Sequence, residues 1–222
     1  MKFRTAAALS LMLIASLTAC NKSEVDQNRP AYVAEGSAPP PPNPGVGTIS
    51  TEVIKDQSTI EFVGAKVTRD HKGDFREFEG AIRYDGARPT EINFDIDVAS
   101  VTTDDLKLTD HLKSEDFFDI VRYPRATFVS TSLTELPAGQ EGGATHMLRG
   151  NLTMHGVTKE VAFPVKTERT AEGVRATAQF TINRQDWEIS YKGMADDLIK
   201  DDVLIKLDLR FPPPPETKAA AK

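Results

Sequence analysis

The stretch EINFDIDV, residues 91–98, alternates polar and apolar residues without a break. A period of two puts the apolar side chains on one face of an extended chain, which is typical of a strand with one buried face. The same alternation is clear in residues 174–182 and 203–211, and weaker in 60–64, 78–84, 126–130, 148–154 and 161–165. About eight such strands predict an all-β fold, either a sandwich or a barrel.

Short turn signals separate these strands. His155-Gly156 and Glu172-Gly173 are tight connections, which favour antiparallel hairpins because parallel pairs need long crossovers. Pro164 lies inside one predicted strand and marks either a sheet edge or a bulge.

The inward faces of the strands mix large apolar residues with small ones. The small ones are Gly64, Gly80, Gly150, Ala126, Ala176 and Ala178. An eight-stranded barrel can be filled by side chains or can hold one small ligand. So many small inward residues favour a cavity, and the alternative is a solid interior in which small residues pack opposite large ones.

The N-terminus has the features of an export signal. Residues 1–19 combine Lys2 and Arg4 with a short apolar run, which predicts a signal peptide too short for a membrane span. The ending Leu-Thr-Ala-Cys resembles a bacterial lipobox, which implies that Cys20 is lipidated and becomes the mature N-terminus. An ordinary cleavage site is the alternative. Asn21 after the cysteine resembles an outer-membrane sorting context, so we expect an anchor on the periplasmic side of the outer membrane.

Two proline-rich segments flank the strands. Residues 20–48 and 212–222 contain few large apolar groups, so they cannot bury enough surface to offset the entropy of ordering. We expect a disordered tether and a disordered tail, with the folded domain at residues 49–211. The net charge of −6 and the lack of a basic stripe exclude nucleic acid as a partner.

One segment, at about 104–118, breaks the strand rhythm. Thr102 and Asp105 can cap a helix start, and Tyr123-Pro124 stops the segment because the residue before proline avoids the helical region. We expect a short helical insertion whose Phe117 and Phe118 close one mouth of the barrel.

Four stretches of the chain together resemble the YceI-like family. They are HLKSEDFFDIVRYPRATF at 111–128, the glycine- and phenylalanine-bearing residues 64–80, LTMHGVTK at 152–159 and NRQDWEI at 183–189. Glu188 stands where many members have glycine. The resemblance spans nearly all of residues 51–211. It implies a lipocalin-like antiparallel β-barrel that binds a polyisoprenoid chain, such as an isoprenoid quinone or a polyprenyl phosphate.

That resemblance, together with the inward pattern, gives a set of expected ligand contacts. The apolar contacts are Phe62, Phe78, Ile82, Phe94, Ile96, Phe117, Phe118, Phe128, Leu152, Met154, Phe163, Phe180 and Ile182. Asn183, Arg184 and Trp187 are expected at the head-group end. The function that follows is a lipid-anchored carrier or buffer of an isoprenoid, without a catalytic cofactor.

Enzyme signatures are weak in this chain. His71, His111, His146 and His155 lack metal-binding spacing with one another or with Cys20, and no catalytic elbow or phosphate-binding loop occurs. His155 in its tight turn is expected to bond to backbone. We therefore expect no catalytic residue and no metal site. The alternatives are an isomerase or hydrolase of isoprenoids that uses His111 or His155, and a structural envelope lipoprotein with a solid barrel.

Overall fold

The computed structural model describes residues 22–37, 49–66, 69–85, 88–191, 193–194 and 197–214. Its helical elements are the 3₁₀ turns η1 (Val25–Gln27), η2 (Lys55–Gln57), η3 (Val98–Ser100), η4 (Glu141–Gly143) and η5 (Arg184–Trp187), and the helix α1 (Leu106–Lys113). Its strands are β1 (Tyr32–Glu35), β2 (Ile49–Glu52), β3 (Thr59–Lys66), β4 (Asp70–Phe75), β5 (Phe78–Asp85), β6 (Arg88–Asp97), β7 (Val101–Thr103), β8 (Arg125–Glu135), β9 (His146–Met154), β10 (Val157–Thr170), β11 (Gly173–Asn183), β12 (Gly193–Met194) and β13 (Asp197–Phe211).

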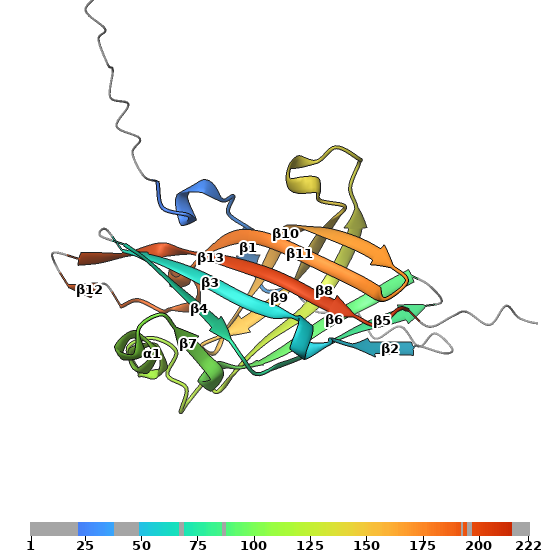
Figure 1. Ribbon diagram of the computed structural model, residues 1–222. Helices are drawn as coiled ribbons and strands as arrows, with labels where there is room; N and C mark the ends of the chain where they lie inside the picture. The colour runs from blue at the N-terminus through green and yellow to red at the C-terminus, as the bar shows by residue number, and fades with distance from the viewer. Residues whose placement is uncertain are drawn as a thin grey trace, which may run out of the picture.

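The strands form one antiparallel sheet that curls around an interior (Figure 1). The order along the sheet is β2-β5-β6-β8-β9-β10-β11-β13-β3-β4-β7, with β1 beside β10 and β12 beside β13. β4 and β5 lie near opposite ends of this order, yet only two residues separate them in the chain. The sheet must therefore curl far enough to bring its two ends together.

The all-β, lipocalin-like prediction is confirmed, but the number of strands is larger than eight. Eleven strands follow one another along the sheet in the described part of the chain. The additional strands β2, β4 and β7 are short, with three to six residues each. Strands of this length hardly repeat the period-two pattern, so hydrophobic alternation does not reveal them.

The small inward residues have two different roles. A Cβ added to Gly80 would run into the ring of Phe94, and one added to Gly150 would run into the ring of Phe128. These glycines make room for phenylalanine rings that lie across them. Ala126, Ala176 and Ala178 instead line a cavity. Both explanations for small residues thus apply, at different positions.

The predicted helical insertion is present as α1 and the turns that follow it. Asp105 caps the helix by accepting hydrogen bonds from the backbone N–H groups of Lys107 and Leu108. Leu112 and Phe117 are buried in the main core cluster, while Phe118 lies 5.9 Å from Phe75, measured between ring centroids. Trp187 and Ile189 belong to the same core cluster as Leu112 and Phe117. The insertion therefore covers the end of the interior where Trp187 and Ile189 lie.

The expected tether is wrong for residues 22–37, which pack on the sheet. Val25 is buried against Val63, Ala65 and Leu204, and β1 pairs with β10. Backbone pairing and a few buried side chains hold this segment despite its low apolar content. The proline-rich residues 38–48 therefore connect β1 to β2. They lie outside the described residues, as do the predicted signal peptide, Cys20 and the tail from residue 215.

Candidate functional site

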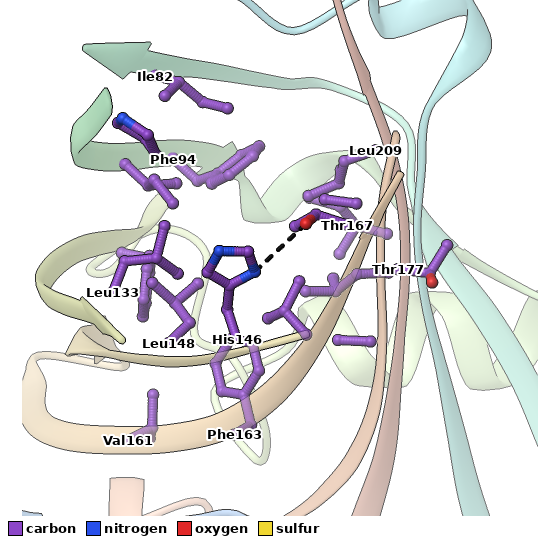
Figure 2. Close-up of a pocket in the computed structure, with 18 of the residues that line it drawn as sticks. Ile82, Phe94, Leu133, His146, Leu148, Val161, Phe163, Thr167, Thr177 and Leu209 are labelled. Carbon is purple, nitrogen blue, oxygen red and sulfur yellow. Dashed lines mark hydrogen bonds between the residues drawn. The ribbon is translucent and has the colours of Figure 1, made fainter. Parts of the chain in front are cut away.

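The curled sheet encloses a cavity of about 570 Å³. Figure 2 shows apolar side chains from several strands converging on it. The apolar lining is formed by Ile60, Phe75, Ile82, Tyr84, Pro89, Ile92, Phe94, Ile96, Ala126, Phe128, Leu133, Leu148, Leu152, Met154, Val161, Phe163, Val165, Val174, Ala176, Ala178, Phe180, Ile182, Ile205, Leu207, Leu209 and Phe211. This volume lies within the range of about 300–1,000 Å³ typical of small-molecule sites. A solid interior is therefore wrong for this domain.

Nine of the thirteen apolar contacts expected from the sequence line this cavity. They are Ile82, Phe94, Ile96, Phe128, Leu152, Met154, Phe163, Phe180 and Ile182. The other four, Phe62, Phe78, Phe117 and Phe118, are core residues and not part of the lining. Phe62 packs on Phe75 with 5.7 Å between ring centroids, and Phe117 packs on His111 and Tyr191.

Polar residues line one end of the cavity. They are Arg88, Glu135, His146, Thr167, Arg169 and Thr177. Arg88 begins β6, Glu135 ends β8 and His146 begins β9. Because these neighbouring strands are antiparallel, the three residues lie at the same end of the curled sheet. We call Arg88, Glu135, His146, Thr167 and Arg169 the polar rim.

Figure 2 shows the imidazole ring of His146 among apolar side chains of the cavity. Its Nδ1 lies 2.8 Å from Thr145 Oγ1 and 3.3 Å from Thr167 Oγ1. The two hydroxyls are 3.0 Å apart, and the Thr145 hydroxyl also accepts from the Thr167 backbone N–H at 2.9 Å. These contacts hold one imidazole nitrogen in place and orient the ring, so that Nε2 can serve as a donor or an acceptor toward a ligand.

The head-group residues expected from the sequence lie elsewhere. Arg184 is buried, and its guanidinium donates to Ile189 O, to Lys200 O at 3.3 Å and to Asp201 Oδ1 at 2.8 Å. Burial lowers the pKa of this guanidinium. Trp187 is fully buried, with Nε1 donating to Leu152 O at 3.1 Å, and Asn183 caps η5. None of the three lines the cavity, so we correct their role from head-group binding to holding β11, η5 and β13 together.

The remaining histidines have partners that explain them structurally. His71 Nδ1 lies 2.9 Å from Asp104 Oδ1, and Arg69 Nε donates to its Nε2 at 3.1 Å. His111 Nε2 lies 3.1 Å from Asp116 Oδ2. His155 Nδ1 lies 3.1 Å from Trp187 O, which confirms the expected bond to backbone. His71, His111 and His155 do not line the cavity.

Two further properties of the described residues bear on function. No group of three or more His, Cys, Asp or Glu side chains among them is placed to hold a metal ion. No helix in the same part of the chain combines the length and the apolar character needed to cross a membrane.

An apolar cavity with one polar rim, inside a curled antiparallel sheet, is the geometry of a binding protein. The comparisons with known proteins show the family. Residues 52–211 match the model of the YceI-like domain, so this chain belongs to the YceI-like family.

Relatives and solved structures agree with this assignment. A UPF0312 protein of Pseudomonas putida is 33% identical over 142 residues, covering 60% of this chain and 71% of the relative. BcnA of Burkholderia cenocepacia is a structural neighbour with a TM-score of 0.62 and 28% identity, covering 71% of this chain and 98% of BcnA. A polyisoprenoid binding domain from Saccharophagus degradans has the same fold, with a TM-score of 0.60 and 18% identity, covering 76% and 100% of the two chains.

Proposed function

We propose that this protein is a lipid-anchored binding protein of the periplasm that holds a polyisoprenoid chain, as a carrier or a buffer. The observation that carries the proposal is the apolar cavity of about 570 Å³ with its single polar rim. A polyisoprenoid has the matching character, since a long hydrocarbon ends in one polar group. The domain from Saccharophagus degradans, which is described as polyisoprenoid-binding, supports the choice of ligand.

Burial of the hydrocarbon would supply most of the affinity. Each buried methylene contributes about 0.8 kcal/mol, so even a few isoprene units can offset the cost of fixing the ligand in the cavity. Phe163 and Phe180 stack with 3.9 Å between ring centroids, and both line the cavity, so they offer apolar surface to the hydrocarbon of the ligand. The ligand is therefore selected mainly by its apolar character and its length.

The polar rim would select the head group. His146 can hydrogen-bond a quinone carbonyl or a hydroxyl, and Arg88 and Arg169 add positive charge against the single carboxylate of Glu135. This rim replaces Asn183, Arg184 and Trp187 as the proposed head-group end. A quinone and a polyprenyl phosphate both match its chemistry, so the two are compared directly by titration.

The membrane anchor in this proposal rests on the sequence alone. Cys20 in its lipobox-like context would carry the lipid, and Asn21 favours the outer membrane. Only Asn21 separates Cys20 from Lys22, where the described chain begins, and one residue spans at most about 3.5 Å. An anchored domain would thus lie close to the membrane surface, where an isoprenoid can be collected or delivered.

The proposal is tested by blocking the cavity from within. Ala176 lines the cavity on β11, so Ala176→Phe would place a ring in the space of the ligand. Gln179 is exposed on the same strand, and Gln179→Phe adds the same ring on the outside. In titrations with a fluorescent geranylgeraniol, Ala176→Phe should weaken binding by about tenfold or more, while Gln179→Phe binds as the wild type does. Equal binding by all three folded proteins, or no binding by any, would contradict the proposal.

A further inference from the structure

The wall of the cavity has a gap that another part of the chain fills. β10 and β11 pair only from Lys166↔Thr177 to Thr170↔Gly173. Beyond this short ladder the strands separate: residues 157–165 of β10 pair with β9 on one side, and residues 178–183 of β11 pair with β13. On this side of β10, Pro164 lies between the residues that pair with β1 and those that pair with β11, so of the two predicted alternatives, edge and bulge, the edge position applies.

Residues 29–35 occupy this gap. β1 pairs with β10 from Tyr32↔Ala162 to Glu35↔Lys159. On the other side, Ala31 N–H donates to Thr181 O at 2.8 Å and Thr181 N–H donates to Arg29 O at 3.0 Å. Pro30 sits between these two bonds and forms the bridge to Thr181, where its missing N–H is not needed. Figure 1 shows β1 beside β10.

The inner face of β1 packs behind the wall of the cavity, although none of residues 29–37 lines the cavity itself. Val33 is directly opposite Val161, which lines the cavity and belongs to the main core, and half-buried Val33 packs against that core. Ala31 is buried in the same cluster. Next to the segment, Phe163 of β10 and Phe180 of β11 stack across the gap. Without β1, two unpaired strand edges and the side chains beneath them would be exposed.

Side-chain contacts to β9 and β10 hold β1 and the residues just after it. Asn151 accepts from Ser37 N–H at 3.0 Å and donates to Ser37 O at 2.6 Å, and Glu160 accepts from the Ser37 hydroxyl at 2.6 Å. Lys159 adds an exposed ion pair to Glu35. Only four residue pairs join β1 to β10, fewer than the nine between β10 and β9. A short strand of this kind opens at a lower free energy than the sheet that it completes.

We propose that residues 29–37 are a displaceable wall strand that opens a lateral slot between β10 and β11, and that the hydrocarbon chain enters the cavity through this slot. This inference rests on the proposed function. A long chain can pass sideways through a slot without being threaded end-first through the polar rim, which costs desolvation of polar groups. The segment lies outside the residues that match the YceI-like domain.

A reversible crosslink tests the slot. In the full chain with Cys20→Ser, the pair Tyr32→Cys and Ala162→Cys joins β1 to β10 at directly opposite positions. Opposite residues in an antiparallel pair have Cα atoms about 4.5–5.5 Å apart, within the range that a disulfide spans. The control pair, Thr127→Cys and Thr153→Cys, crosslinks β8 to β9 on the outer face of the sheet.

The readout is the rate at which fluorescent geranylgeraniol moves from phosphatidylcholine vesicles into the protein. Oxidation of the Tyr32–Ala162 pair should slow uptake by about tenfold or more, reduction should restore it, and the equilibrium affinity should stay within about twofold. The control pair should show no redox effect. Asn151→Ala, which removes two of the three hydrogen bonds to Ser37, should accelerate uptake by about tenfold.

Each alternative result has a definite meaning. Uptake at the same rate with the strand locked and unlocked, at unchanged affinity, would overturn the slot and leave the proposed function intact. No binding at equilibrium by either redox form would overturn the proposed function, and the slot with it.

Discussion

Gly150 gives a quantitative test of how phenylalanine rings shape the cavity. In Gly150→Ala, the new Cβ would lie 2.7 Å from Phe128 Cε2 and 2.7 Å from Val129 O, whereas ordinary contact begins at 3.4 Å. Phe128 Cζ would lie closer still, so the ring of Phe128 must move by roughly 1 Å. Because Phe128 lines the cavity, this movement drives the ring into the ligand space or against Phe163, whose centroid is 6.1 Å away.

The expected cost of Gly150→Ala follows from this overlap. Overpacking of a core costs about 1–3 kcal/mol, and in a domain of this size each kcal/mol lowers the melting temperature by about 2–4 °C. We expect a decrease of about 2–12 °C, measured by circular dichroism, and a weaker affinity for geranylgeraniol. Gly64→Ala is the matched control, since its Cβ would meet nothing within 4 Å and the substitution stiffens the unfolded chain. Equal melting temperatures for the two variants would refute the reasoning.

Three other predictions test the rim, the corrected residues and the wall strand. His146→Leu should weaken binding of a prenyl quinone by about fivefold, the value of one hydrogen bond, and leave binding of a plain isoprenoid hydrocarbon unchanged in parallel titrations. Arg184→Leu should lower the free energy of unfolding in urea by about 3 kcal/mol, because it strands buried acceptors. The folded fraction should keep its ligand affinity, and a stable variant that loses affinity would restore the head-group role. The pKa of Glu160 lies below its ordinary value of 4.5, because the carboxylate accepts from Ser37 and Arg149. Because the folded pKa is the lower one, the ionised carboxylate stabilises the folded protein fully above pH 4.5, and this stabilisation is lost as the pH falls through the folded pKa. The wild type should therefore be more stable than Glu160→Gln near neutral pH, and thermal melts should show the difference shrinking in acid. A difference that grows in acid would contradict this prediction.

The period of two identified the inward faces but not the depth of each side chain. Ile82 and Phe78 both point inward from β5, yet Ile82 lines the cavity while Phe78 is core. Depth along the barrel depends on strand stagger, which is set by long-range register. The register shift between Ile199 and Val203 is an example that no local pattern reveals.

The polar residues were harder to predict than the apolar ones. His146 follows a glycine-containing turn and has no neighbour of catalytic or metal spacing, so its sequence context resembles that of any loop residue. Its role depends on Thr167, twenty-one residues away. Arginine and tryptophan occur both in head-group sites and in protein cores. For Arg184 and Trp187, only the hydrogen-bond acceptors seen in the structure, which are protein groups, show that both belong to the core.

The N-terminal segment escaped prediction for a different physical reason. Residues 20–48 have low apolar content as a whole, but Val25, Ala31 and Val33 are enough to hold residues 22–37 when strand edges on β10 and β11 offer hydrogen bonds. Composition measures the average of a segment. Pairing with a distant unpaired edge is a property of the folded sheet.

The most direct test of the central claim is the content of the cavity in protein isolated from its own envelope. The full chain and its Ala176→Phe variant would be extracted with organic solvent, and the extracts analysed by mass spectrometry. We predict about one polyisoprenoid per wild-type chain and much less from Ala176→Phe, whose added ring lies in the cavity. Extracts without isoprenoid, or with equal amounts from both proteins, would contradict the account.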